Sequence, residues 1–422
     1  MEKAIDTRSK FQAIIFPVLD VLLNGGNLAI HIYISWYLTS GDYGILNAYF
    51  SLLFVLMIFG MAIQTYFAKI VSQTNFSKNT KTNFIAKMNQ MTNVVIIGIT
   101  SIMFIIINPM TQLLRGQPHQ YLMMLSIFII QARVSYYRGY LQGQKKFLKL
   151  NSSFYIEMGA KLLLLIPLLH YYRSIESILV SVLAGMMASL IVTKKAATLT
   201  SESHNQNIQF KLNIKEAAKN KSSFIPLIKG FSNVLSTQVF FYYFTAITLI
   251  LANYYIGEKS GVYAVSARYG QIFIHIGLSI ITVLIPYTSE VKDNQQAFKK
   301  KVTKLLGLYT LIGTFILIAY AVAMPVALKL LFSPVYYGAR TLILPHAAAY
   351  FMLSISFFMA SMEMVAGDKD YIKTLVVFSL MLLIALVKWN NTLEQIVTIE
   401  LVTYTLMALV LVLRFLTRRI KK

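Results

Sequence analysis

A series of long apolar segments constrains this chain more than any other feature of its sequence. A helix needs about 17–25 mostly apolar residues to cross a bilayer, and twelve segments of that kind can be counted. Only 13% of the residues are charged, whereas soluble domains carry about 25%. The sequence therefore predicts an all-α integral membrane protein with twelve transmembrane helices. The expected spans are 11–38, 43–68, 90–109, 119–137, 150–170, 176–193, 223–254, 261–286, 305–332, 341–366, 371–388 and 394–413.

Basic residues gather in alternate connections between these segments. Of the 39 Lys and Arg residues, 29 lie in or beside one set of connections and six in or beside the other, which leaves four that belong to neither set. Cytoplasmic loops carry an excess of Lys and Arg, so the alternation predicts that both termini are cytoplasmic. The net charge of +23 then reflects orientation and lipid contact rather than nucleic-acid binding. The basic set is the N-terminus, 69–89, 138–149, 194–222, 287–304, 367–373 and the C-terminus.

The longest polar connection, 194–222, divides the chain into two six-helix bundles, 1–193 and 223–422. An internal repeat supports this division, because residues 42–72 align with 259–289 at a constant offset of 217. Both segments are the second helix of their half and run in the same direction, so the repeat predicts a pseudo-twofold axis along the membrane normal. The matched residues are Gly44 with Gly261, Gly60 with Gly277, Ile63 with Ile280, Thr65 with Thr282 and Ser72 with Ser289.

The first expected span carries a polar stripe. Asp20, Asn24, Asn27 and His31 follow a spacing that places all four on one helical face. An ionisable group at the bilayer centre costs at least about 2.5 kcal/mol, which makes Asp20 a functional candidate. The stripe either lines a water-filled cavity or makes interhelical hydrogen bonds that fix packing. Four polar groups over three turns favour the cavity, with Asp20 as a coupling-ion candidate.

The eighth expected span carries a second stripe, which begins at Arg268 and continues through Gln271 and His275 to Ser279 and Thr282. Arg268 lies about 13 Å inside the helix, too deep to reach water easily. A guanidinium at this depth can hold a phosphate with two parallel hydrogen bonds. The alternative is a buried ion pair with an acid. The spacing favours anion binding by Arg268, with Gln271 and His275 as cavity residues.

Two further basic residues lie close to the cytoplasmic ends of their spans. For Lys229 and Arg133, extension of the side chain to the membrane surface is the simpler interpretation. Lys229 nevertheless stays a secondary candidate for anion contact, because Asn233 follows it at a helical spacing.

The remaining charges in the spans leave alternatives open. Glu157 and Lys161 stand at i and i+4, in the order that favours an intrahelical ion pair. That pair and a direct contact of Lys161 with an anionic substrate are equally supported. Glu157, Glu363 and Glu400 are candidates for coupling-ion sites or for partners of the buried cations.

Several kinds of chemistry lack their usual signatures. Cysteine is absent, so no disulfide, thiolate metal site or cysteine nucleophile is available. The chain has neither a phosphate-binding GxxxxGK[ST] loop nor an HExxH zinc motif. We therefore expect no enzymatic activity, metal or cofactor, although a Ser-His-Asp triad cannot be read from sequence alone.

Two stretches resemble bacterial polysaccharide flippases of the Wzx type, in the multidrug/oligosaccharidyl-lipid/polysaccharide exporter superfamily. One is the segment around Gly44, which runs from Gly41 to Ser72. The other is Arg138-Gly139-Tyr140-Leu141-Gln142-Gly143, followed by Lys145-Lys146-Phe147 and Glu157, which is similar to an Arg-Gly-x-x-Gln-Gly element after the fourth helix of that family. The segment from Gly261 to Pro286 and Glu290 resembles the family's second-half signature.

The resemblance implies two bundles in a V around a cationic cavity, which move a polyprenyl-diphosphate-linked oligosaccharide to the outer leaflet by alternating access. Arg268 falls where related lipid II flippases also use a cavity arginine, and Lys161 is a second candidate for the diphosphate. Asn24, Asn27, His31, Gln271 and His275 would then contact sugars. The implied setting is a bacterial cytoplasmic membrane, with a polysaccharide polymerase and chain-length machinery as possible partners.

Two rival functions stay open. Asp20 is similar in kind to the first-helix acid that multidrug exporters of the same superfamily use for cation coupling, which keeps drug export as an alternative. Twelve expected spans rather than fourteen argue against a lipid II flippase. A membrane-bound glycan polymerase or acyltransferase is disfavoured, because the chain has no large external loop and no evident catalytic constellation.

Overall fold

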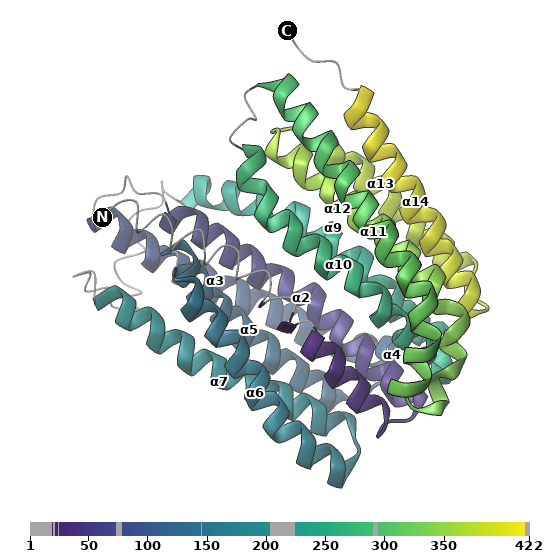
Figure 1. The fold of residues 1–422 in the computed structure, drawn as a ribbon. Helices are drawn as coiled ribbons and strands as arrows, with labels where there is room; N and C mark the ends of the chain where they lie inside the picture. The colour runs from purple at the N-terminus through teal and green to yellow at the C-terminus, as the bar shows by residue number, and fades with distance from the viewer. Residues whose placement is uncertain are drawn as a thin grey trace. The chain divides into compact units, whose positions relative to one another are not determined.

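The structure is a computed structural model in which almost every described residue is helical (Figure 1). It describes residues 19, 22–23, 25–72, 78–144, 146–202, 224–289 and 294–417, with only the backbone described in some helical stretches such as 224–234 and 282–287. Residues 25–35 are helical. The α-helices that follow are α2 (Ser40–Ser72), α3 (Lys78–Ile105), α4 (Ile107–Leu114), α5 (Pro118–Gly143), α6 (Phe147–Tyr172), α7 (Ile175–Glu202), α9 (Phe224–Ile256), α10 (Ser260–Ser289), α11 (Gln295–Leu331), α12 (Arg340–Val365), α13 (Tyr371–Lys388) and α14 (Leu393–Thr417), with short 3-10 helices η2 (Gly257–Lys259) and η3 (Pro334–Ala339).

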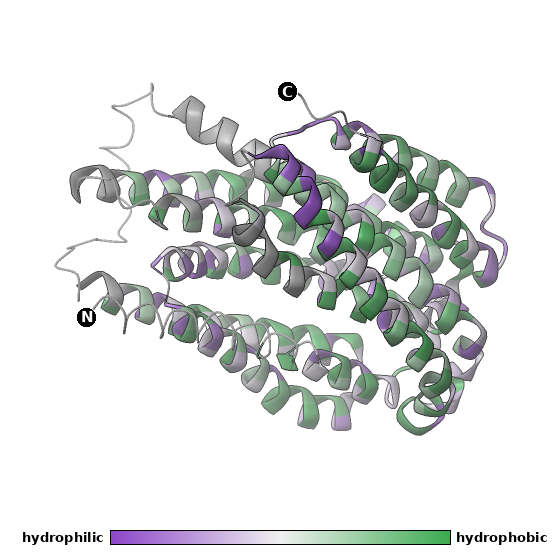
Figure 2. Cartoon of the chain, turned by 45° about the horizontal axis from the view of Figure 1, so that its top comes forward, coloured by the Kyte–Doolittle hydropathy of each residue, from purple (hydrophilic) through white to green (hydrophobic). Residues whose placement is uncertain are grey.

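Within the described residues, the expected apolar segments fall on these helices, although 90–109 runs from α3 into α4. This agreement confirms the all-helical membrane class. Among the described residues, nine segments are long and apolar enough to cross a membrane. One of them, Val239–Gly277, runs from α9 through η2 into α10 and so covers two expected spans. Helix α5 does not reach the same apolarity, since it carries buried Gln131 and Arg138. Figure 2 shows hydrophobic residues along the helices and hydrophilic ones mainly toward their ends.

The chain packs as two compact units that do not coincide with the two expected halves. Unit 1 comprises Met1–Ala48 and Tyr243–Lys422, and unit 2 comprises Tyr49–Tyr242. Both α2 and α9 therefore contribute residues to each unit. The division at the 194–222 linker stays a prediction, since those residues lie largely outside the described part of the chain.

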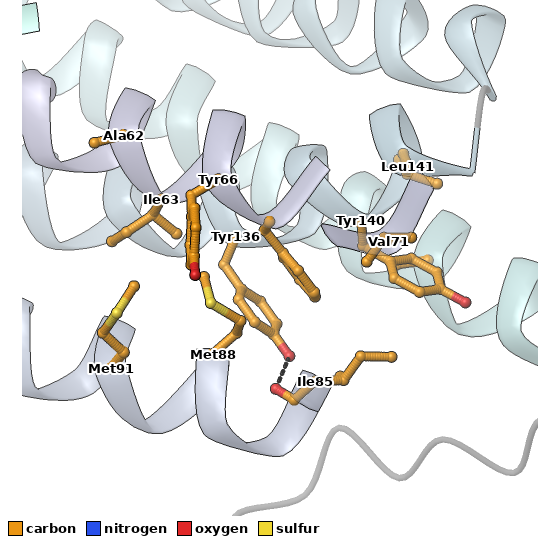
Figure 3. Packing of buried hydrophobic residues seen from close by; sticks show 12 residues of the cluster. Ala62, Ile63, Tyr66, Val71, Ile85, Met88, Met91, Tyr136, Tyr140 and Leu141 are labelled. Carbon is orange, nitrogen blue, oxygen red and sulfur yellow. Dashed lines mark hydrogen bonds between the residues drawn. The ribbon is translucent and has the colours of Figure 1, made fainter. Parts of the chain in front are cut away.

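In unit 2, α5 is the central helix and packs against α3, α4, α6 and α7. Its aromatic residues meet α2 and α3 in the hydrophobic cluster of Figure 3, where Tyr136 stacks on Phe67 with ring centroids 4.9 Å apart. The Tyr136 hydroxyl also donates a 3.2 Å hydrogen bond to the carbonyl oxygen of Ile85 in α3. These contacts fix α3 against α5 while keeping the buried tyrosine satisfied.

In unit 1, α12 is the central helix and packs against α10, α11, α13 and α14. Gly313 of α11 lets the ring of Phe351 approach so closely that an added Cβ would lie 2.1 Å from it. Tyr309, one turn earlier, stacks on Phe358 with centroids 5.7 Å apart. The small residue Gly313 thus allows aromatic side chains of α11 and α12 to pack closely against the neighbouring helix. Small residues are common at such interhelical contacts in membranes.

The repeat has a counterpart in packing. Gly60 of α2 faces Ser135 of α5, with an added Cβ 2.9 Å from the hydroxyl oxygen. Its repeat partner Gly277 of α10 faces Ser354 of α12, where an added Cβ would lie 3.2 Å from the serine Cβ. In each half, then, a glycine of the second expected helix allows close approach to a serine of the fourth.

Candidate functional site

Arg268 lies at the centre of a polar cluster inside unit 1. The residue as a whole is only 9% exposed. Nε and Nη2 donate hydrogen bonds of 3.0 and 2.8 Å to Oδ1 of Asn47 in α2, and Nη1 donates one of 2.8 Å to Oε1 of Gln271. These acceptors are uncharged amides, so the contacts orient the fork of the guanidinium without neutralising its charge.

Asn47 is itself held in place. It is fully buried and its Nδ2 donates a 2.7 Å hydrogen bond to the carbonyl oxygen of Tyr43, one turn earlier in α2. The Tyr43 hydroxyl lies 3.3 Å from Nδ1 of His31. Residues from the first helix, α2 and α10 thus join in one network, which we call the Arg268 cluster: His31, Tyr43, Asn47, Arg268 and Gln271.

The predicted cavity residues meet this network to different extents. His31 and Gln271 belong to the Arg268 cluster. His275 is half-buried on α10, one turn beyond Gln271. Asn27 is exposed one turn before His31. Asp20 and Asn24 lie outside the described residues, and of Lys229 only the backbone, within α9, is described.

Unit 2 holds a second charged network, around Arg138 of α5. Arg138 is 2% exposed and donates from Nη2 to Oε2 of Glu157 at 2.7 Å. Its Nε donates to Ser153 at 3.0 Å, and Nη2 also donates to Ser189 of α7 at 2.9 Å. Glu157 therefore forms an ion pair with Arg138 across helices. Lys161 is half-buried one turn further along α6.

The remaining residues of the Arg-Gly-x-x-Gln-Gly element face α2. An added Cβ on Gly139 would lie 2.8 Å from the carbonyl oxygen of Gln64, and one on Gly143 would lie 2.6 Å from Cβ of Val71. Gln142 accepts a 3.0 Å hydrogen bond from Nε2 of Gln64. This element therefore tightens the packing of α2, α5, α6 and α7 inside unit 2.

Glu400 and His346 form a buried pair in unit 1. Both side chains are 0% exposed, and His346 Nε2 lies 2.7 Å from Oε2 of Glu400. His346 Nδ1 lies 2.7 Å from the hydroxyl oxygen of Ser266 in α10. Within the described residues, Oε1 of Glu400 has no hydrogen-bond partner. The rings of Tyr263 and Tyr350 lie beside the imidazole of His346, with ring centroids 4.7 and 5.7 Å from it.

Glu363 lies at the far end of α12 and is 1% exposed. Its Oε2 is 3.8 Å from Nη2 of Arg414, which also contacts Asp368 at 3.1 Å and Asp370 at 3.7 Å. Arg414 of α14 thus holds the connection between α12 and α13. Among the described residues, no group of three or more His, Asp or Glu side chains is arranged to hold a metal ion.

Sequence reasoning missed the partners that come from other helices. It named Arg268 and Glu400 but neither Asn47 nor His346, which are 221 and 54 positions away in the chain. Polar residues inside an apolar span were the one available signal, and both Asn47 and His346 carry that signal.

Comparison with known proteins gives the fold but no family. No family model matches the chain, and no curated protein matches its sequence. Among solved structures, a multidrug resistance MATE family transporter of the MOP superfamily, in an inward-facing conformation, superposes with a TM-score of 0.74 at 11% identity, over 96% of this chain and 98% of that one.

Two further solved structures extend the comparison. The lipid II flippase MurJ, in an inward closed conformation, gives a TM-score of 0.74 at 11% identity, over 97% of this chain and 88% of that one. A MOP superfamily transporter from Pyrococcus furiosus is described as having a binding pocket of reversed polarity. It gives a TM-score of 0.68 at 13% identity, over 96% of this chain and 95% of that one. The chain is a multi-pass membrane protein with the fold that these transporters and flippases share.

Proposed function

We propose that the chain is a flippase that moves a polyprenyl-diphosphate-linked oligosaccharide from the inner to the outer leaflet of a bacterial cytoplasmic membrane. The observation that carries the proposal is the geometry of Arg268, whose guanidinium is buried and oriented by two uncharged amide side chains, Asn47 and Gln271. A diphosphate that crosses a region of low dielectric constant needs a fixed countercharge, because its solvation by water is lost there. A pre-oriented guanidinium supplies that charge.

The substrate's other parts have matching partners in the proposal. His31 and Gln271 of the Arg268 cluster, with Asn27 and His275 beside it, offer donors and acceptors for sugar hydroxyls. Lys161 and Lys229 remain secondary candidates for the diphosphate. The prenyl tail stays in the bilayer, against the exposed apolar faces of the helices. Rocking of two bundles would expose the site alternately, and a polysaccharide polymerase with its chain-length machinery would receive the product.

The test uses a strain that lacks this gene, complemented with the wild type, with Arg268→Gln or with Arg340→Gln. Arg340 is the matched control, because it is an exposed arginine in the same unit. We expect wild type and Arg340→Gln to restore surface polysaccharide. Arg268→Gln, at equal membrane abundance, should leave a polyprenyl-diphosphate oligosaccharide on the cytoplasmic side. Full surface polysaccharide with Arg268→Gln would remove Arg268 from the mechanism.

A second candidate function, cation-coupled multidrug export, is favoured by the His346–Glu400 pair. A fully buried carboxylate, one oxygen of which has no hydrogen-bond donor among the described residues, suits a group that binds and releases a proton or a monovalent cation. If the deletion strain keeps normal surface polysaccharide but becomes sensitive to cationic drugs, this function replaces the flippase.

A further inference from the structure

A third polar cluster, in unit 2, joins α3 to α5 and contains none of the residues assigned to the proposed function. Arg133 of α5 donates from Nη1 to Oδ1 of Asn89 at 2.9 Å and from Nη2 to Oδ1 of Asn93. Asn89 is 9% exposed, and Arg133 and Asn93 are half-buried. The structure directs the guanidinium to α3 rather than along α5 to the membrane surface, which sequence reasoning had expected.

The helix faces next to Arg133 pack closely against each other. Tyr136, three residues later, donates to the carbonyl oxygen of Ile85, and Met88 next to Asn89 belongs to the same hydrophobic cluster (Figure 3). The packing of α3 on α5 therefore sets the positions of both asparagine oxygens. Site geometry that is fixed by packing in this way loses little entropy when a ligand binds.

In the part of the chain that the structure describes, the charge of Arg133 is not balanced by an acid. Within the described residues, no carboxylate lies within 4.0 Å of its guanidinium, and its hydrogen-bond acceptors are two neutral amides. A guanidinium has five N–H donors, and the two asparagines take two of them. The remaining edge of the fork has the shape that binds two oxygens of a phosphate.

We propose that Arg133, Asn89 and Asn93 form a phosphate-binding site, distinct in its residues from the Arg268 cluster. Its ligand is the phosphate of a membrane lipid, either the diphosphate of a prenyl-linked cargo or the headgroup of a bilayer phospholipid. The inference goes beyond the proposed function, because a phosphate ester bound at Arg133 is detectable on the purified protein whether or not the chain flips a glycan.

The decisive variant is Asn93→Asp. It keeps the size of the side chain and places a carboxylate beside the guanidinium, so a merely structural link between α3 and α5 would be retained or strengthened. A phosphate site, in contrast, would lose its ligand, because the new carboxylate takes the place of the anion and repels it. Asn108→Asp is the matched control, since Asn108 is an exposed asparagine of α4 in the same unit.

Binding is measured on the purified full chain in an Arg268→Gln background, which removes the site of the proposed function from the readout. The probes are farnesyl diphosphate and phosphatidylglycerol, and lipid retention is followed by native mass spectrometry. We expect Asn93→Asp and Arg133→Gln to weaken binding about tenfold or more, as for loss of hydrogen bonds to a charged group. Asn108→Asp should match the Arg268→Gln parent.

The two probes separate the sources of the phosphate. A loss limited to farnesyl diphosphate assigns the site to a prenyl-diphosphate cargo, and a loss limited to phosphatidylglycerol assigns it to a bilayer lipid. Unchanged affinity of Asn93→Asp for both probes overturns the proposal. Because Asn93→Asp preserves the link between the helices, the test stands even if Arg133→Gln does not fold.

Discussion

Gly44 and Gly261, which the internal repeat places at equivalent positions, lie at one contact between the starts of α2 and α10. An added Cβ on Gly261 would lie 2.3 Å from the carbonyl oxygen of Ser40, and one on Gly44 would lie 1.8 Å from the hydroxyl oxygen of Ser260. The two helices thus approach each other through glycines at their N-terminal ends. Asn47, which orients Arg268, lies one turn beyond Gly44 along α2. The glycine contact therefore sets the distance between Asn47 of α2 and Arg268 of α10.

Gly261→Ala is expected to destabilise the protein more than Gly44→Ala. The new methyl group at position 261 meets a backbone oxygen at 2.3 Å, which must move. At position 44 the nearest atom is a serine hydroxyl that can rotate away, and the remaining contacts are longer, at 2.9 Å to Cβ of Ser260 and 3.1 Å to the backbone nitrogen of Gly261. Overpacking of a tight contact typically costs about 1–3 kcal/mol. Thermal unfolding of the purified variants measures the difference.

Gly307→Ala is the control for this pair. Gly307 lies in α11 with no atom within 4 Å of an added Cβ, so alanine should stabilise the helix by about 0.5–1 kcal/mol. An unfolding temperature for Gly261→Ala equal to or above that of Gly307→Ala would contradict the close approach of α2 and α10.

Arg138→Leu is expected to destabilise unit 2 by about 3 kcal/mol, the lower end of the range for a buried ion pair that loses one partner. The lower end applies because the Glu157 side chain is 18% exposed and keeps some solvation. The double variant Arg138→Leu, Glu157→Leu should lose less unfolding free energy than the two single variants lose in sum. A double-mutant cycle by thermal unfolding gives the coupling energy, and a value near zero would refute the pairing.

Glu400→Gln separates folding from ion coupling. The amide keeps the shape of the side chain and an acceptor for His346 but cannot bind a proton or a cation as a carboxylate does. We expect a folded protein whose transport no longer depends on the proton or sodium gradient. The measurement is substrate uptake into proteoliposomes with an imposed proton or sodium gradient. The control is Glu394→Gln, because Glu394 is an exposed residue on the same helix. Gradient dependence equal to the wild type would exclude Glu400 as the coupling group.

The helices and the fold class could be predicted because each expected span is encoded by its own local run of apolar residues. Arg268 and Gln271 could be paired for the same reason, since three positions along one helix fix their neighbourhood. The contact of Arg138 with Glu157 could not, because it depends on the rotation and height of α5 against α6. The apolar composition of the two helices determines neither this rotation nor this height.

The Arg-Gly-x-x-Gln-Gly element shows the same limit from the other direction. The resemblance suggested a functional role for this element. In the structure, Gly139 and Gly143 allow the close approach of α2. Arg138 forms hydrogen bonds from α5 to α6 and α7. A motif in a membrane helix can thus encode packing as readily as binding. Charge and small size are needed for both purposes, so only the partners across the interface distinguish them.

Asn47→Asp distinguishes substrate binding by Arg268 from a structural role for that arginine. The substitution keeps the size of the side chain and turns the acceptor of two Arg268 hydrogen bonds into a carboxylate. If Arg268 serves only to link α2 and α10, a charged acceptor at the same place preserves the link, and export should continue. If Arg268 binds the diphosphate, the internal carboxylate neutralises it, and export of the glycan should fall at least tenfold while the protein stays folded in the membrane. Surface polysaccharide is quantified in the complemented deletion strain alongside unfolding of the purified variant, and normal polysaccharide from a stable Asn47→Asp protein would leave Arg268 as a structural residue.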